Sequence, residues 1–177
     1  MTRANCAVGL APFDAPGVDW FAGMDPLNVR EIEWALEGEE TLARELEREA
    51  AAMLEQVARD PSTFLSDWQL PEGDREKLAE DEGSEVLRQT INEAFRRGVW
   101  GYVDDTLCLI RPWGFSVSEI RVATRIVYGL SDVLVPRQHG EWLARNVPRA
   151  EAVVREQGHM SDRDQVIDEL RWLLEPV

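Results

Sequence analysis

The chain has 177 residues, 44% of them apolar, and a formal net charge of −15 at neutral pH. This length and composition allow a buried core and exclude a disordered chain, while the acidic balance argues against nucleic acid as a partner, because phosphate binding needs a basic surface. With no run of eighteen apolar residues and no secretory signal at the N-terminus, we expect a cytoplasmic protein that does not enter a membrane.

The first predicted element is a short strand in "ANCAVGLAP" (residues 4–12), an apolar run that Gly9 and Pro12 bring to an end. It contains Cys6, and Cys108 lies in another apolar run far along the chain. Two distant cysteines of this kind are typical of buried free thiols and not of a disulfide or a metal site. We therefore expect neither a metal ion nor a cofactor.

About a hundred residues of helical character follow the first strand. The segments "EETLARELEREAAAMLEQVARD" (39–60) and "SEVLRQTINEAFRR" (84–97) place apolar residues on one helical face and Glu and Arg on the other. The breakers that divide the region into several helices are Gly38, Pro61, Pro71–Gly73 and Gly83. We predict that residues 24–111 form an all-helical insertion, and that residues 1–23 and 112–177 form the core.

Strands and helices alternate in the last third of the chain. Strands are predicted in "ATRIVYGLSD" (123–132) and "AEAVVREQG" (150–158), and helices in "PRQHGEWLARNV" (136–147) and "SDRDQVIDELRWLLEP" (161–176). Short, nearly continuous apolar runs are typical of parallel strands covered on both faces. The alternation predicts a wound α/β sheet.

Two polar residues follow these last two strands. Asp132 ends the second predicted strand and His159 follows the third. Taken singly, an Asp at this position often closes a turn with its own backbone, and a His before a helix is often a surface residue. The other histidine, His139, is predicted to be an ordinary residue of the helix after Pro136.

Together and in this order, these segments resemble the C-terminal half of the α/β-hydrolase fold. "GLSDVLVP" (129–136) resembles the family's turn that carries the triad acid, and "GHMS" (158–161) resembles its histidine loop. "APFDAPGVDWFAGM" (11–24) and "RPWGF" (111–115) resemble the segments that flank a helical cap in bacterial members. The resemblance implies a partial α/β-hydrolase fold with about three parallel strands, flanking helices and a large helical cap over residues 24–111.

The resemblance also implies roles for individual residues. Asp132 would orient His159, the general base of a catalytic triad, and Asp14 is an alternative acid because some members place the acid after the earlier strand. Four tryptophans are candidate walls of an apolar pocket under the cap: Trp20, Trp68, Trp100 and Trp113. For at least half of them, packing between cap and core is the alternative role.

The sequence contains no G-x-S-x-G or G-x-C-x-G motif, and the nearest segment, "GFSVS" (114–118), lacks the second glycine. The resemblance therefore implies a truncated hydrolase without its nucleophile, oxyanion donors and first five or so strands, inactive alone. The alternatives are one half of a split hydrolase, completed by a separate N-terminal half, and a non-catalytic remnant or binding module. A small-molecule substrate is expected only for the completed enzyme, and self-association through the exposed strand edge is expected without it.

Overall fold

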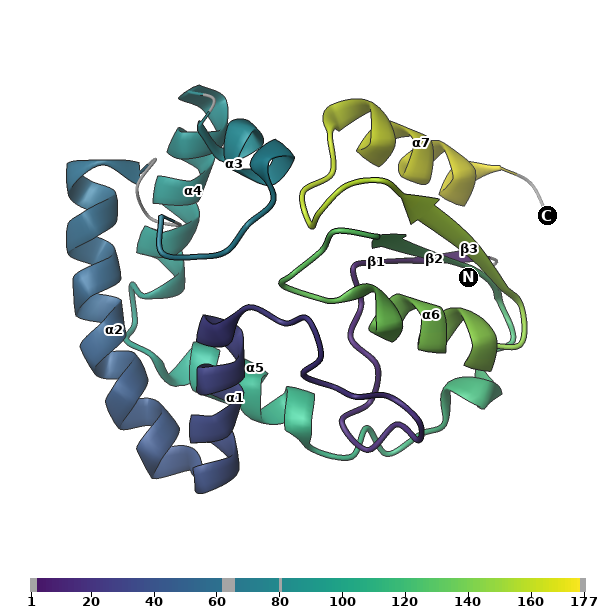
Figure 1. Cartoon of the computed structure of the whole chain (residues 1–177), viewed down its shortest axis with the longest axis horizontal. Helices are drawn as coiled ribbons and strands as arrows, with labels where there is room; N and C mark the ends of the chain where they lie inside the picture. Colours follow the sequence, from purple (N-terminus) through teal and green to yellow (C-terminus); the bar gives the residue numbers. More distant parts are fainter. Residues whose placement is uncertain (1–2, 62–65, 80, 176–177) are drawn as a thin grey trace. The chain divides into compact units, whose positions relative to one another are not determined.

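The computed structural model describes residues 3–61, 66–79 and 81–175, and the chain divides into two compact units (Figure 1). Unit 1 comprises Met1–Met24 and Pro112–Val177, and unit 2 comprises Asp25–Arg111. Within the described ranges, no helix is long and apolar enough to cross a membrane.

Unit 1 is built on a sheet of three parallel strands in the order β1-β2-β3. The strands are β1 (Arg3–Ala7), β2 (Ala123–Gly129) and β3 (Ala150–Arg155). A short 3-10 helix, η2 (Val117–Glu119), precedes β2, and the helices are α6 (Arg137–Asn146), between β2 and β3, and α7 (Arg163–Leu174), after β3. Figure 1 shows α6 and α7 on opposite faces of the sheet. The central strand β2 is the most buried because it has a strand on each side and a helix on each face.

The core of unit 1 joins β2 to α6. Its buried members are Val117, Ile126, Tyr128, Leu143 and Val147. Helix α6 lies close to the strand because it has glycine at position 140, where an added Cβ would stand 2.5 Å from the Tyr128 ring. The close approach brings the first turn of α6 against Tyr128, near the end of β2.

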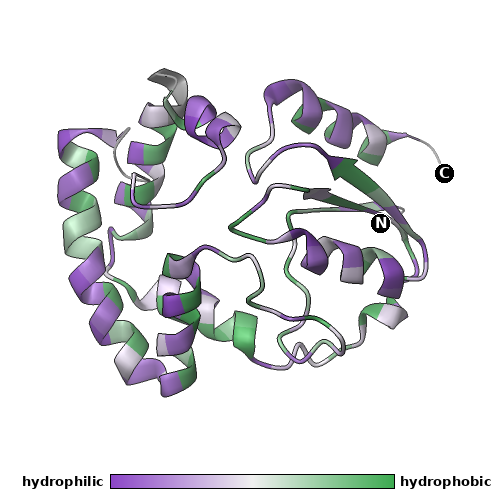
Figure 2. Cartoon of the chain, in the orientation of Figure 1, coloured by the Kyte–Doolittle hydropathy of each residue, from purple (hydrophilic) through white to green (hydrophobic). Residues whose placement is uncertain are grey.

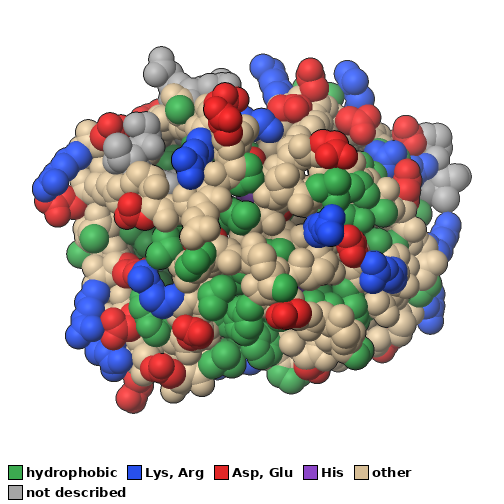
Figure 3. Space-filling model, viewed as in Figure 1, with side chains coloured by type: hydrophobic (Ala, Val, Ile, Leu, Met, Phe, Trp, Pro, Cys, Tyr) green, Lys and Arg blue, Asp and Glu red, His purple; other side chains and the backbone are tan. Residues whose placement is uncertain are grey.

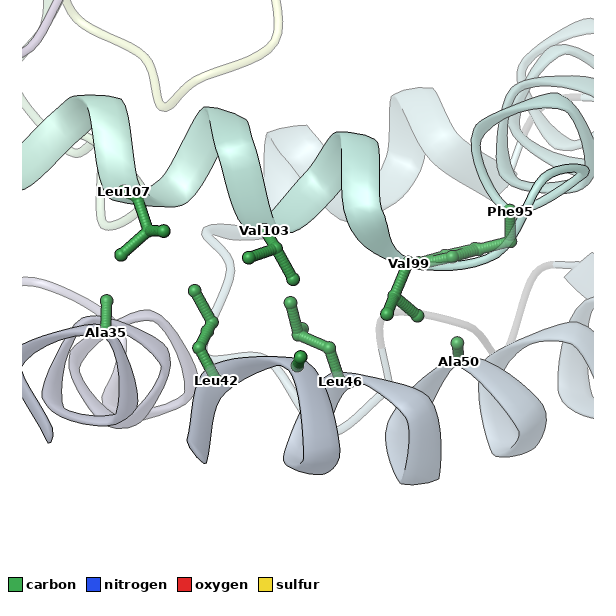
Figure 4. Close-up of a cluster of buried hydrophobic side chains, with 9 residues drawn as sticks. Ala35, Leu42, Leu46, Ala50, Phe95, Val99, Val103 and Leu107 are labelled. Atoms are coloured by element: carbon green, nitrogen blue, oxygen red, sulfur yellow. The ribbon is translucent and has the colours of Figure 1, made fainter. Parts of the chain in front are cut away.

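Unit 2 consists of helices. They are α1 (Pro26–Glu37), α2 (Glu39–Arg59), α3 (Glu72–Ala79), α4 (Asp81–Ala94) and α5 (Trp100–Ile110). Val103 and Leu107 of α5 point toward Leu42 and Leu46 of α2 in a buried cluster (Figure 4). Figure 2 shows hydrophobic and hydrophilic residues alternating along α2, as expected for a helix with one buried face.

These elements confirm the predicted fold class of three parallel strands, flanking helices and a large helical insertion. Two local predictions were wrong. Gly83 does not break the helix, because α4 runs through it from Asp81 to Ala94. Cys108 is exposed, because Val103, Thr106 and Leu107 form the buried face of α5 and position 108 lies off it. Cys6 is a half-buried free thiol, and burial raises its pKa.

The charged surface is mixed. Lys and Arg side chains lie among Asp and Glu side chains on the face drawn in Figure 3. Several of these charged side chains pair with a residue of the same helix. Arg88 pairs with Glu85 in α4, and Arg145 pairs with Glu141 in α6. Such exposed pairs add at most about 1 kcal/mol each to stability, so they contribute little to holding the fold together.

Candidate active site

The turn after β2 is closed by the side chain of Asp132. The residue is only 4% exposed, and its Oδ1 accepts hydrogen bonds from the backbone N–H groups of Leu134 at 2.8 Å and Val135 at 2.9 Å. A buried carboxylate is costly unless it is hydrogen-bonded, and these two donors satisfy one of its oxygens. The side chain of Asp132 therefore does close the turn after β2.

The second carboxylate oxygen of Asp132 binds the other residue of the predicted pair. Oδ2 lies 3.0 Å from Nδ1 of His159, which confirms the expected contact. An ionised carboxylate only accepts hydrogen bonds, so Nδ1 must carry the proton and donate it. In the neutral ring the basic nitrogen is then Nε2. The His159 side chain is 25% exposed, so the pair joins a fully buried acid to a partly accessible imidazole.

The His159 loop comes close to the acid turn because β2 ends in glycine. An added Cβ on Gly129 would lie 2.3 Å from the carbonyl oxygens of both Gln157 and Gly158. Two backbone hydrogen bonds join the turn and the loop: Leu130 N–H to Arg155 O at 2.9 Å and Ser131 N–H to Gln157 O at 3.0 Å. Only a residue without a side chain permits this approach.

A polar network anchors the same loop to α7. Arg155, at the end of β3, forms an ion pair with Glu169 at 2.6 Å and also donates to Gln165 at 3.1 Å. Gln157 donates to Gln165 at 3.0 Å and to the carbonyl oxygen of Met160 at 2.9 Å. Because Gln157 and Met160 flank His159, these contacts fix the loop that presents the imidazole.

His139, predicted to be an ordinary helical residue, is a fully buried structural residue. Its Nδ1 accepts the N–H of Ala11 at 3.2 Å, so Nε2 carries the proton and donates to the carbonyl oxygen of Trp20 at 3.0 Å. Burial lowers the pKa of His139, although its hydrogen bond to Trp20 and the nearby Asp132 act in the opposite direction. One weak indication in the sequence that His139 is buried is the residue that follows it, Gly140, which allows α6 to pack closely against the sheet.

The alternative acid and two of the tryptophans lie elsewhere in unit 1. Asp14 is exposed and lines a hollow with Trp113. Trp20 is buried, donates its indole N–H to Ala11 O at 3.0 Å and meets the His139 ring edge-on. Trp20 therefore packs inside the unit.

The other two tryptophans line separate hollows of unit 2. Trp68 borders a hollow of about 260 Å³ that also includes Glu31 and Tyr102. Burial raises the pKa of Glu31, which accepts hydrogen bonds from Tyr102 and Thr106, each at 2.8 Å. Trp100 is 53% exposed beside another hollow. In the described part of the chain, no group of three or more His, Cys, Asp or Glu side chains could hold a metal ion.

The solved structures that share the fold of this chain include the following three. A thermophilic esterase from Thermogutta terrifontis is 18% identical with a TM-score of 0.54, and the match covers 97% of this chain and 55% of that one. A hydrolase from Pseudomonas aeruginosa is 22% identical with a TM-score of 0.51, covering 75% and 51%. An N-acyl homoserine lactone degrading enzyme is 16% identical with a TM-score of 0.50, covering 98% and 57%.

These likenesses show the fold: the chain has part of an α/β-hydrolase fold. It spans about half the length of the solved structures that it matches. No family model matches the sequence. No curated protein matches it either.

Proposed function

We propose that this chain supplies the acid and the base of a serine-hydrolase type of site that cleaves an ester or a related acyl bond. The observation that supports this most directly is the 3.0 Å contact between Asp132 Oδ2 and His159 Nδ1. An orienting carboxylate on the far ring nitrogen is what a general base needs to hold one tautomer and one direction. The fold likeness to hydrolases and an esterase agrees with this assignment.

In the proposed reaction His159 transfers two protons, one in each half of the reaction. Its Nε2 takes the proton of a hydroxyl nucleophile as the oxygen bonds to the acyl carbon, and the resulting imidazolium is stabilised by ionised Asp132. The imidazolium then protonates the leaving alcohol, and an acyl-enzyme remains. Water, deprotonated by the same nitrogen, attacks the acyl carbon. The proton taken from water then passes to the nucleophile oxygen as its bond to the acyl carbon breaks, which releases the acid.

In this proposal the nucleophile lies outside the 177 residues. No G-x-S-x-G motif occurs in this sequence. We infer that the nucleophile and the oxyanion donors come from polypeptide outside these residues, on the same or a separate chain, and that the 177 residues alone do not turn over substrate. Unit 2 takes the role of the family's helical cap in this proposal.

The second candidate function is a non-catalytic binding module with the same ancestry. The missing nucleophile motif favours it. The two candidates differ in what Asp132 and His159 do: in an enzyme they are needed for turnover, and in a binding module their contact only stabilises the loop.

The test is co-expression of the 177 residues with the polypeptide encoded directly upstream, followed by assay on p-nitrophenyl butyrate. The proposal expects activity only when both parts are present, and a loss on the order of 10⁴-fold in kcat for Asp132→Asn. His159→Ala should lose at least as much. The isolated chain should match its own His159→Ala variant.

A fluorophosphonate probe separates the two candidates in the same sample. Labelling of one serine in the upstream part, abolished by prior reaction with a slow ester substrate, supports the enzyme. Turnover that is unchanged in His159→Ala would exclude the proposed reaction. A complete complex without turnover or labelling would exclude it as well and favour the binding module.

A further inference from the structure

A second hollow of unit 1 has the chemistry of a binding site. It measures about 490 Å³, within the size range of small-molecule sites. It lies between the loop after β1 and the loop before η2, which run beneath α6 in Figure 1. Neither Asp132 nor His159 is among its lining residues, so it is distinct from the candidate active site.

Aromatic rings form much of its wall. Trp113 and Phe115 have ring centroids 5.8 Å apart with planes inclined by 34°, and Trp142 of α6 adds a third ring. The Trp142 indole N–H donates to the carbonyl oxygen of Pro16 at 3.1 Å, which fixes that ring. Phe115 is 55% exposed, so its ring is available to a ligand instead of being used in the core.

The charges around the hollow have one sign. Asp14 contributes an exposed carboxylate, and no Lys, Arg or His is among the lining residues. The remaining wall includes Pro12 and Pro112, which add carbon surface without charge. The faces of aromatic rings carry negative electrostatic potential, so this wall and Asp14 attract a cation together.

Ser116, Ser118 and Asn146 also line the hollow and can accept hydrogen bonds, so the aromatic rings, and not a lack of acceptors, favour one kind of cation. A quaternary ammonium has no N–H group, and its methyl groups pack against carbon while its charge interacts with the rings. We propose that this hollow binds the quaternary ammonium group of a small molecule, with Trp113, Phe115 and Trp142 as the walls and Asp14 as the counter-ion.

The test compares choline with its uncharged carbon isostere, 3,3-dimethylbutan-1-ol, in titrations of the full chain followed by NMR. The indole N–H signals of Trp113 and Trp142 should shift with choline, and the isostere should bind at least roughly tenfold more weakly because it lacks the charge. Sodium chloride at equal ionic strength serves as the blank. Equal binding of choline and the isostere would overturn the proposal, since the hollow would then be merely apolar.

Variants locate the site. Phe115→Leu and Asp14→Asn alter exposed side chains, and each should weaken choline binding by roughly threefold to thirtyfold. Trp100→Leu removes an equally exposed ring from unit 2 and should leave the affinity unchanged. Choline affinity that survives both Phe115→Leu and Asp14→Asn, or that falls with Trp100→Leu, would refute the assignment.

Discussion

At the scale of single residues, Asp132 shows how one carboxylate meets two demands. Oδ1 closes the turn through two backbone N–H groups, and Oδ2 receives the Nδ1 proton of His159. A turn residue and an orienting residue were competing interpretations of the sequence, but the two oxygens make them compatible. No sequence pattern distinguishes the two roles, because both need an Asp at the same position.

Asp132→Asn should therefore change the tautomer of His159 while sparing the turn. The amide oxygen can replace Oδ1, but the amide nitrogen donates a hydrogen bond where Oδ2 accepts one, so the ring proton should move from Nδ1 to Nε2. Ring ¹⁵N shifts at a pH where the ring is neutral measure the change. His139 supplies the control in the same spectrum, since its proton should stay on Nε2. An Nδ1–H tautomer of His159 in the variant would contradict the assignment.

His139 gives the fold a specific dependence on pH. Burial lowers its pKa in the folded chain below the value of about 6.5 in the unfolded chain. Below pH 6.5 the unfolded chain takes up a proton that the folded chain resists, so stability falls as the pH decreases, by at most about 1.4 kcal/mol per pH unit.

His139→Gln should remove this component, because the amide can accept from Ala11 N–H and donate to Trp20 O without titrating. Urea unfolding of both proteins between pH 7.5 and 5 measures the difference, in which the contributions of His159 and the carboxylates cancel. Parallel pH profiles for the two proteins would show that His139 titrates normally in the folded chain.

At the scale of elements, the sequence predicted those strands and helices whose positions depend on hydrophobic periodicity and on strong breakers. The apolar runs at residues 123–132 and 150–158 became β2 and β3, and Pro136 precedes α6 as expected. The predictions for Gly83 and Cys108 were wrong because α4 runs through Gly83 and because position 108 lies off the buried face of α5. The contacts that set the active-site geometry, such as the close approach at Gly129, depend on backbone proximity between segments that the sequence does not display.

Gly129→Ala tests that approach. The new methyl group would overlap two carbonyl oxygens of the histidine loop, and we expect a loss of about 1–3 kcal/mol in the free energy of unfolding together with displacement of His159 from Asp132. Gly101→Ala in α5 is the matched control, because an added Cβ there meets nothing within 4 Å. Gly101 is the second residue of α5, so that change should alter the free energy of unfolding by less than about 1 kcal/mol, the value for a helix interior. A stable Gly129→Ala chain that keeps the Asp132–His159 contact would show that the loop can move aside without loss.

At the scale of the whole molecule, unit 1 has an open strand edge and an exposed apolar helix face among the residues that the structure describes. Strand β1 has a strand neighbour on one side only in the described sheet. Val8 donates its N–H to Val127, and because alternate residues of a parallel strand face the same neighbour, the N–H groups of Asn5 and Ala7 face the free edge. On α7, three apolar side chains spaced four residues apart are exposed: Val166, Leu170 and Leu174.

An open strand edge pairs with other chains, and exposed apolar surface strengthens such contacts, so we predict that the purified 177 residues self-associate. Light scattering over a range of concentrations should show a mass that rises with concentration. Ala7→Pro removes an edge donor while leaving the bonds to β2 in place, and proline is tolerated at a free edge, so this variant should associate less. Ala7→Ser keeps the donor and should behave like the parent chain. Leu170→Glu tests the contribution of α7 separately.

A compact monomer at high concentration, with a single cooperative melting transition, would mean that the edge of β1 is protected in solution. If Ala7→Pro and Ala7→Ser associated equally, the contact would instead lie on another surface.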